Sequence, residues 1–154
     1  MSAVKSEKVV NAALSEVWKT WDAYGDVYKF HPGVEKSYLL EDSVQAGKGA
    51  RRRCDFVGGK NYVLEEIVSY NPEASFTHKL YDGNIPVKHA FVTFTFQPLG
   101  TDRTKVLISA EFKMKFGLLG ALLKPIMRKQ LQKGLDAMLD GNADYLAKQI
   151  RFAA

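Results

Sequence analysis

The fold is decided by residues 118–152, LLGALLKPIMRKQLQKGLDAMLDGNADYLAKQIRF. Apolar residues recur there in steps of three and four, which places them on one side of an α-helix, and charged residues occupy the other side. A helix of about thirty residues would be about 45 Å long, more than a small domain covers unless its partner is broad and curved. The apolar side comprises Leu123, Met127, Leu131, Leu135, Met138, Leu139, Ala143, Leu146 and Ile150.

The beginning of this helix contains residues that oppose helix formation. Gly117, Gly120 and Pro125 interrupt the pattern, and proline suits the first turn of a helix better than its interior. We therefore expect a short apolar segment over 118–123, followed by a main helix from about Lys124. Gly134 and Gly141 lie inside that helix, where each costs about 1 kcal/mol relative to alanine. This cost is tolerable where the missing side chain leaves room for something.

The residues before the helix alternate between apolar and polar side chains, as strands do. Turn residues such as Gly58-Gly59 and Asn71-Pro72 separate the alternating segments, which indicates an antiparallel meander. On the last two strands one face is apolar, with Phe94 and Phe112 among its members, and the other is largely polar. Such a sheet is covered on one side only, and the long helix is the expected cover. The six expected strands span 34–42, 49–56, 62–70, 75–81, 88–97 and 105–116.

The N-terminal part adds a seventh strand and two short helices. Residues 4–12 are expected to form the strand, and Ser15 is a suitable N-cap for a helix whose apolar face carries Trp18, Trp21 and Tyr24. Gly25 is expected to end this helix, and residues 26–33 to form a short irregular helix or turn. The predicted fold class is α+β, with one domain over 1–154.

Composition limits the location and the partners. The apolar share is 46% and the charged share 25%, as in an ordinary folded domain. No apolar run approaches the roughly 20 residues of a membrane span, the N-terminus MSAVKSEKVV lacks the apolar core of a signal peptide, and Cys54 has no second cysteine to pair with. These features predict a cytoplasmic protein.

The net charge of +5 raises the question of nucleic acid. The basic residues are dispersed, however, and Arg51, Arg52 and Arg53 would point to alternate faces of a strand, so we predict no nucleic-acid binding. The histidines His31, His78 and His89 lack metal-ligand spacing, and the glycines match neither a phosphate-binding loop nor a dinucleotide motif. No metal or other cofactor is expected, and the oligomeric state stays open.

The order of strand, two short helices, six strands and long helix resembles the helix-grip fold of the START and Bet v 1-like superfamily, also called SRPBCC. Within it, the chain is most similar to the bacterial polyketide cyclase/dehydrase and lipid-transport branch. The resemblance covers essentially the whole chain and is carried by residues 11–18, NAALSEVW; 49–52, GARR; 64–67, LEEI; and 116–120, FGLLG. It implies a seven-stranded curved sheet wrapped around the long helix, with an apolar tunnel between them. Members of this superfamily bind lipids, hormones or polyketides, and only some are enzymes.

The resemblance also implies which side chains point inward. It suggests an inward direction for Arg52 on the third strand, and it places a pocket glutamate at Glu65 on the fourth. An inward carboxylate needs a cation, which Arg52 could supply. The alternative is that Glu65 lies on the outer face, because a register slip of one residue reverses every side chain.

The leading hypothesis is that the protein binds a hydrophobic or amphipathic small molecule, such as a lipid, polyketide or isoprenoid. One alternative is a cyclase, dehydratase or isomerase in which Glu65, His31 or His78 moves protons in the same cavity. Another is a membrane-surface or protein-interaction module, because Lys124, Arg128, Lys129 and Lys133 lie beside the apolar segment 118–123. The expected polar contacts are Arg52, Glu65, Tyr81 and His31, and the expected walls are Phe56, Val63, Phe94, Phe112, Leu123, Met127, Leu131 and Met138.

Overall fold

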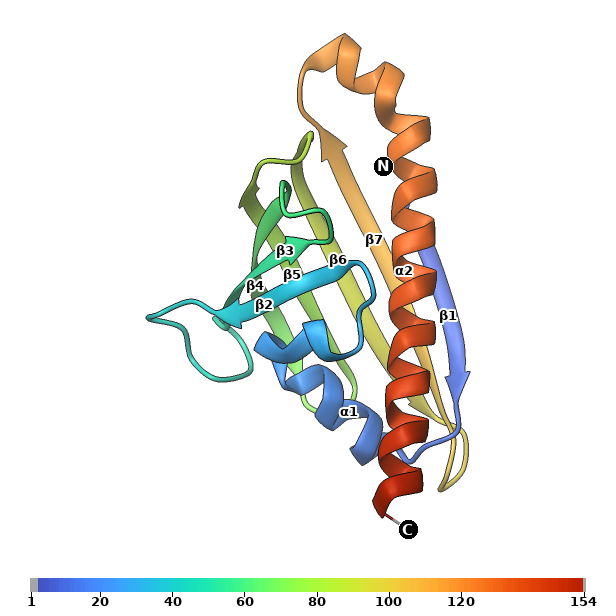
Figure 1. The fold of residues 1–154 in the computed structure, drawn as a ribbon. Coiled ribbons are helices and arrows are strands. Elements are labelled where there is room, and N and C mark those ends of the chain that lie inside the picture. Colours follow the sequence, from blue (N-terminus) through green and yellow to red (C-terminus); the bar gives the residue numbers. More distant parts are fainter. Residues whose placement is uncertain (1–2, 154) are drawn as a thin grey trace.

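The computed structural model describes residues 3–153, in which seven strands form one antiparallel sheet (Figure 1). The sheet order is β1-β7-β6-β5-β4-β3-β2, so only the β1–β7 pairing joins strands distant in sequence. This arrangement confirms the predicted α+β helix-grip fold. The strands are β1 (Val4–Val10), β2 (Val34–Leu39), β3 (Arg51–Phe56), β4 (Tyr62–Asn71), β5 (Ser75–Gly83), β6 (Val87–Pro98) and β7 (Thr104–Met114); the helices are α1 (Leu14–Asp22), the 3-10 helix η1 (Tyr24–Lys29) and α2 (Gly117–Ala153).

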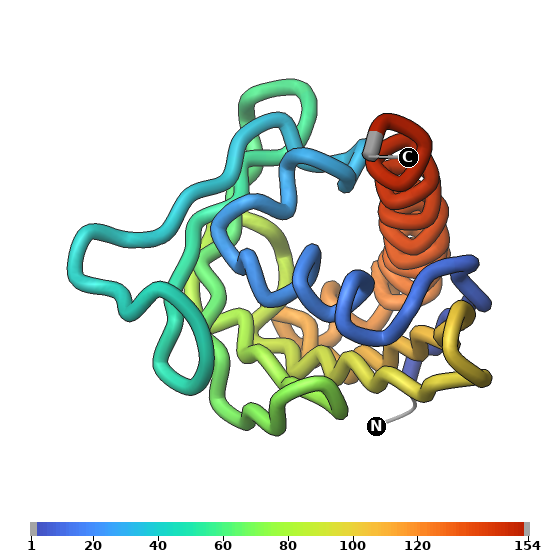
Figure 2. Tube along the Cα trace, turned by 90° about the horizontal axis from the view of Figure 1, so that it is seen from below, coloured from blue at the N-terminus to red at the C-terminus, as the bar shows by residue number. Residues whose placement is uncertain are grey.

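The sheet curves because its hydrogen-bond register shifts at several points. The β4–β5 pair carries two shifts, between Leu64 and Glu65 and between Ile67 and Ser69, and further shifts occur at the start of β2 and of β6. Such bulges bend a strand and increase its twist. Seen along the molecule, the sheet curves partly around toward α2, while α1 and η1 cross between them at one end (Figure 2).

Helix α2 begins earlier than the sequence predicted. It is assigned as one helix from Gly117, with Pro125 inside it, so the expected start at Lys124 is wrong. Phe116 and Gly117 have positive φ values of 68° and 52°, and they turn the chain sharply from β7 into the helix. Figure 1 shows the first turns bent away from the rest of α2, as expected around an internal proline. Among residues 3–153, no helix combines the length and apolar character needed to cross a bilayer.

Helix α1 also differs from its predicted ends. Its N-cap is Ala13, which makes no side-chain capping bond, so Ser15 is not the cap. The helix ends at Asp22, before Gly25, and η1 follows directly. Gly25 instead allows η1 to pack closely on β2, because a Cβ there would lie 2.9 Å from the Leu39 Cγ atom.

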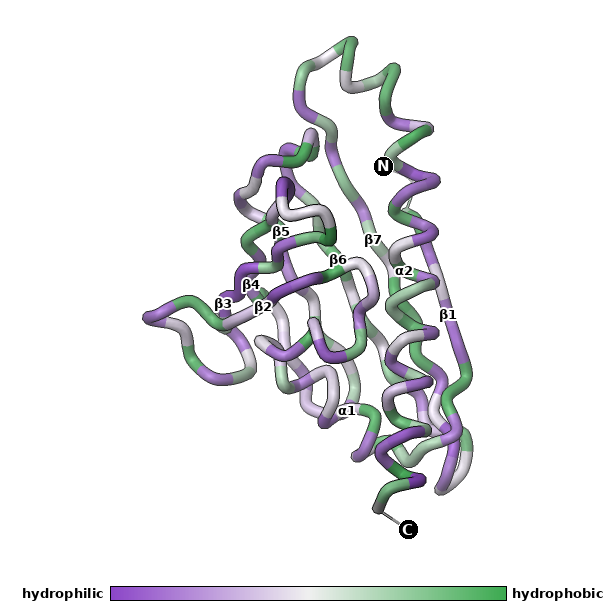
Figure 3. The backbone as a smooth tube through the Cα atoms, in the orientation of Figure 1, coloured by the Kyte–Doolittle hydropathy of each residue, from purple (hydrophilic) through white to green (hydrophobic). Residues whose placement is uncertain are grey.

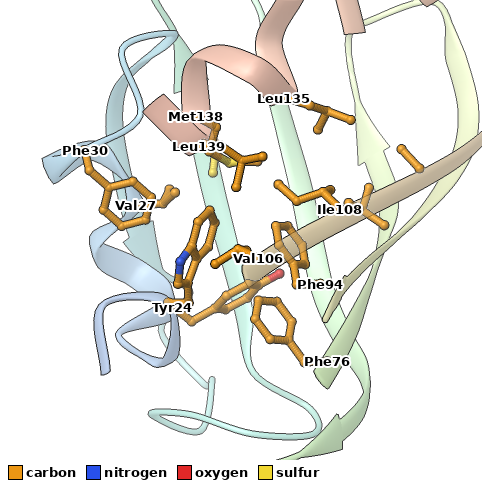
Figure 4. Close-up of a cluster of buried hydrophobic side chains, with 14 of the residues drawn as sticks. Tyr24, Val27, Phe30, Phe76, Phe94, Val106, Ile108, Leu135, Met138 and Leu139 are labelled. Atoms are coloured by element: carbon orange, nitrogen blue, oxygen red, sulfur yellow. The ribbon is translucent and has the colours of Figure 1, made fainter. Parts of the chain in front are cut away.

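The core lies between the concave face of the sheet, α1 with η1, and the second half of α2 (Figure 4). Its aromatic part includes Phe76 and Phe94, which stack with ring centroids 4.5 Å apart, and Trp21, which lies 5.2 Å from Phe94. Asn142 joins the two helices: it accepts from Trp21 Nε1 at 3.1 Å and donates to Thr20 Oγ1 at 2.9 Å. Both hydrogen bonds satisfy polar groups that the core would otherwise leave unpaired.

Candidate ligand-binding interior

Arg52 and Glu65 form an ion pair on the concave face of the sheet. They are direct cross-strand partners on β3 and β4, and Arg52 Nε donates to Glu65 Oε2 at 2.7 Å. Both side chains are almost fully buried. The predicted inward pair is therefore present, and the alternative that Glu65 lies on the outer face is wrong. Its role toward a ligand stays a prediction.

Two further residues surround the carboxylate of Glu65. His78 Nε2 on β5 lies 3.5 Å from Glu65 Oε1, and the Cys54 thiol donates to Glu65 Oε2 at 3.8 Å. His78 faces inward because it lies two residues from both Phe76 and Leu80 on β5, and all three buried side chains share one face of the strand. The buried carboxylate on β4 is thus surrounded by groups from both neighbouring strands, β3 and β5.

Tyr24 of η1 completes the cluster. Arg52 donates through a terminal nitrogen to the Tyr24 carbonyl at 2.9 Å, and its guanidinium carbon lies 4.0 Å from the centre of the Tyr24 ring. The Tyr24 hydroxyl and His78 Nδ1 are buried and have no hydrogen-bond partner. Buried polar atoms usually have partners, so these two are available to a polar group of a bound molecule. The sequence reasoning missed Tyr24, which it had assigned to the apolar face of α1.

The charges in this cluster are fixed at neutral pH. Burial alone would raise the pKa of Glu65, but the neighbouring His78 and Arg52 outweigh it and hold this pKa at about 2. Burial lowers the pKa of His78 to about 4, so its imidazole is neutral and Arg52 is the cation that balances Glu65. Burial also raises the pKa of the Cys54 thiol to about 12, which keeps the thiol protonated and a poor nucleophile.

Inward-facing apolar side chains near the first half of α2 are less buried than those of the core. Phe56 and Met114 lie at inward positions at the ends of β3 and β7, yet they are only half-buried, as are Met127 and Leu131 on α2. Gly134 follows on the same side of the helix, and a Cβ built there would meet no heavy atom within 4 Å. The predicted cavity between the sheet and α2 would lie beside these half-buried side chains, and its presence stays a prediction.

The predicted wall residues fall into three groups. Val63, Phe94, Phe112 and Met138 are buried members of the core, whereas Phe56, Met127 and Leu131 are half-buried and pack against it. Leu123 is 37% exposed on the overhanging first turns of α2. None of these positions tests the predicted contact with a ligand.

Two of the predicted polar contacts need separate comment. Tyr81 is 37% exposed and interacts with Arg51 and Glu66 on the outer face, so its expected inward position is wrong. The register shift in β4–β5 pairs Glu65 with Leu80 and Leu64 with Asp82, which leaves Tyr81 without an opposite residue. His31 lies between η1 and β2, where its Nδ1 accepts from the Gly33 amide at 3.1 Å. Burial lowers the pKa of His31 to about 4, so it is neutral at neutral pH.

A separate groove of about 670 Å³ lies between α1, η1 and the last turns of α2. Charged residues such as Lys19 and Asp26 line it together with Phe30 and Tyr145, and none of the predicted site residues does. Within residues 3–153, no group of three or more His, Cys, Asp or Glu side chains is arranged to hold a metal ion. At Glu65, the neighbouring Arg52 already supplies the positive charge.

The sequence profile described as polyketide cyclase / dehydrase and lipid transport matches residues 1–147. Together with the helix-grip architecture, this match shows that the chain belongs to that family, within the START and Bet v 1-like superfamily. No functionally curated protein matches the sequence significantly.

Several solved structures share the fold. The Zhui aromatase/cyclase from Streptomyces sp. R1128 is 16% identical, with a TM-score of 0.85 over 99% of this chain and 97% of that chain. A START superfamily protein from Mycobacterium smegmatis is 16% identical, with a TM-score of 0.76 over 95% and 99%. Norcoclaurine synthase from Thalictrum flavum, in complex with dopamine and hydroxybenzaldehyde, is 18% identical, with a TM-score of 0.73 over 96% and 87%. At these identities the likeness shows a common fold.

Proposed function

We propose that this protein binds one apolar or amphipathic small molecule in the interior between the curved sheet and α2. The observation that carries the proposal is the buried cluster of Arg52, Glu65 and His78, with unpartnered polar atoms on Tyr24 and His78. A charged, hydrogen-bonding cluster within an apolar interior is a typical means of orienting a ligand whose affinity comes mainly from apolar burial.

The chemistry of the interior favours a ligand with an apolar body and one or two neutral polar groups. Because Arg52 and Glu65 neutralise each other, a charged head group would have to compete with an existing ion pair. A hydroxyl or carbonyl group could instead pair with the Tyr24 hydroxyl or His78 Nδ1. Aromatic polyketides, lipids and isoprenoids carry such groups. The family description, which names polyketides and lipids, supports the first two of these classes, and the Zhui aromatase/cyclase supports an aromatic ligand.

We propose binding in preference to proton-transfer catalysis. An efficient general acid or base has a pKa near the working pH, whereas the pKa of Glu65 is held at about 2 and that of His78 at about 4. Neither group can donate a proton at neutral pH, and both are weak bases. A cyclase or dehydratase would need a ligand that moves these pKa values toward neutrality.

The test fills the interior without disturbing the fold. Gly134→Phe places a ring where the structure has open space, and Lys133→Phe places the same ring on the exposed side of the same turn. Titration of the tryptophan fluorescence with an apolar panel of fatty acids, aromatic polyketides and isoprenoids should show saturable binding to the wild type and to Lys133→Phe. Gly134→Phe should lose at least about tenfold in affinity.

Circular dichroism of both variants verifies that they remain folded. If no member of the panel binds the wild type saturably, or if folded Gly134→Phe binds as tightly as the wild type, the proposal is wrong.

A further inference from the structure

The first turns of α2 carry an exposed apolar surface that ligand binding does not explain. Leu118 is 88% exposed, Leu122 75% and Ile126 57%. They follow one another in steps of four, so they form one line along the helix. We call the set Phe116, Leu118, Leu119, Leu122, Leu123 and Ile126 the apolar tip.

The charged residues that flank the apolar tip in the sequence are all basic. Residues 112–135 contain five lysines and one arginine and no aspartate or glutamate. The line through Leu118, Leu122 and Ile126 continues into Lys129 and Lys133, which are both exposed. One side of α2 therefore changes from apolar to basic along its length. A lipid monolayer changes in the same order, from the apolar acyl chains inside to the charged head groups at its surface.

The apolar tip lies at one end of the molecule, next to two loops (Figure 3). The Lys115 amide donates to the Pro86 carbonyl at 3.0 Å, and Asn84 Nδ2 donates to the Lys60 carbonyl at 2.6 Å. These bonds connect the segment between β7 and α2 with the β5–β6 loop, and that loop with the β3–β4 loop. The β3–β4 loop adds Val57, 65% exposed, and the basic Lys60 to the same end.

From this arrangement we propose that the apolar tip inserts into the surface of an anionic lipid bilayer, with the flanking lysines contacting the head groups. Apolar insertion and electrostatic attraction together give stable binding at an interface, where either alone is weak. A second copy of the chain is the poorer occupant, because two tips in contact would bring their lysines together. The inference does not depend on the proposed ligand.

The experiment is co-sedimentation of the full chain with vesicles of phosphatidylcholine, alone or enriched in phosphatidylglycerol. The wild type should bind the phosphatidylglycerol vesicles, and added salt should weaken this binding. Replacing both Leu118 and Leu122 by Asp should reduce the bound-to-free ratio at least about tenfold. Both side chains are highly exposed, so the fold should survive.

Two control variants separate the tip from general surface effects. Val44→Asp with Phe152→Asp makes the same change in charge at exposed apolar residues outside the tip. Its vesicle binding should fall only by the effect of the lower net charge, and therefore less than that of the Leu118 and Leu122 variant. Lys129→Gln with Lys133→Gln should weaken binding by about fivefold per lysine, more than Lys19→Gln with Lys148→Gln does.

Three results would overturn the inference. The wild type fails to bind phosphatidylglycerol vesicles; the Val44 and Phe152 control loses as much binding as the Leu118 and Leu122 variant; or sedimentation velocity shows a wild-type dimer that the tip variant converts to a monomer. Ligand binding measured without vesicles is independent of all three, so its failure and the failure of this inference are distinguishable.

Discussion

The side chains of the buried cluster show what alternation can predict. Arg52 and Glu65 occupy facing inward positions on adjacent strands, so their pairing follows from strand register. The inward position of His78 follows from the same rule, because His78 shares a face of β5 with Phe76 and Leu80. Tyr24 could not be found this way, since its contact with Arg52 depends on how η1 folds back over the sheet. Tyr81 was misplaced because it directly follows the inward-facing Leu80 on β5, so alternation turns it to the outer face.

The neutral, buried state of His78 makes stability depend on pH. Its pKa is about 4 in the fold and about 6.5 when exposed, so the unfolded chain binds more protons between these values. The contribution of neutral His78 to the free energy of unfolding is fully present above about pH 6.5, and it falls as the pH decreases toward 4. We expect His78 to contribute a loss of about 2 kcal/mol between about pH 7 and about pH 5, measured by urea unfolding.

The matched variant is His78→Phe, which keeps a ring beside Phe76 and Phe94. His31 contributes to the same pH window in both proteins, so the difference between their slopes isolates His78. A variant whose stability falls with pH as steeply as that of the wild type would refute the assignment.

At the scale of elements, strand patterns were informative and helix ends were not. Each predicted strand overlaps the observed one, with ends that differ by up to three residues, because alternation continues into the turns. The start of α2 was mispredicted since Pro125 reads as a first-turn residue, whereas the chain accommodates it within a bent helix. The missing side chains of Gly134 and Gly141 were predicted to leave room for something. In the structure only Gly141 leaves room for another segment, because the Phe30 carbonyl lies against it.

Gly134 and Gly141 should therefore respond oppositely to alanine. A Cβ at Gly134 meets no atom within 4 Å, so Gly134→Ala should stabilise the protein by about 1 kcal/mol through helix propensity. A Cβ at Gly141 would lie 2.0 Å from the Phe30 carbonyl oxygen, so Gly141→Ala should destabilise it by about 1–3 kcal/mol. Thermal unfolding measures both effects, and the unfolding temperature of the wild type should lie below that of Gly134→Ala and above that of Gly141→Ala. Shifts of the same sign would contradict this packing.

At the scale of the whole molecule, the order of elements predicted the sheet and the long helix that packs against it, whereas the apolar tunnel between them stays a prediction. The order did not predict the curvature of the sheet or the bend in α2, because neither the register shifts nor the bend leaves a periodic signal in the sequence. The exposed apolar tip follows from the same bend, which carries the first turns of α2 away from the rest of the helix (Figure 1).

The central claim is that a ligand occupies the space between the sheet and α2, and methionine methyl groups report on it directly. Met114 and Met127 are half-buried on the facing sides of β7 and α2, and Met138 is buried in the core. In a protein labelled with ¹³C at the methionine methyl groups, titration with a ligand found by fluorescence should shift the Met114 and Met127 resonances saturably. The account predicts the same dissociation constant from both residues. A ligand that binds saturably while leaving both resonances unchanged would contradict it.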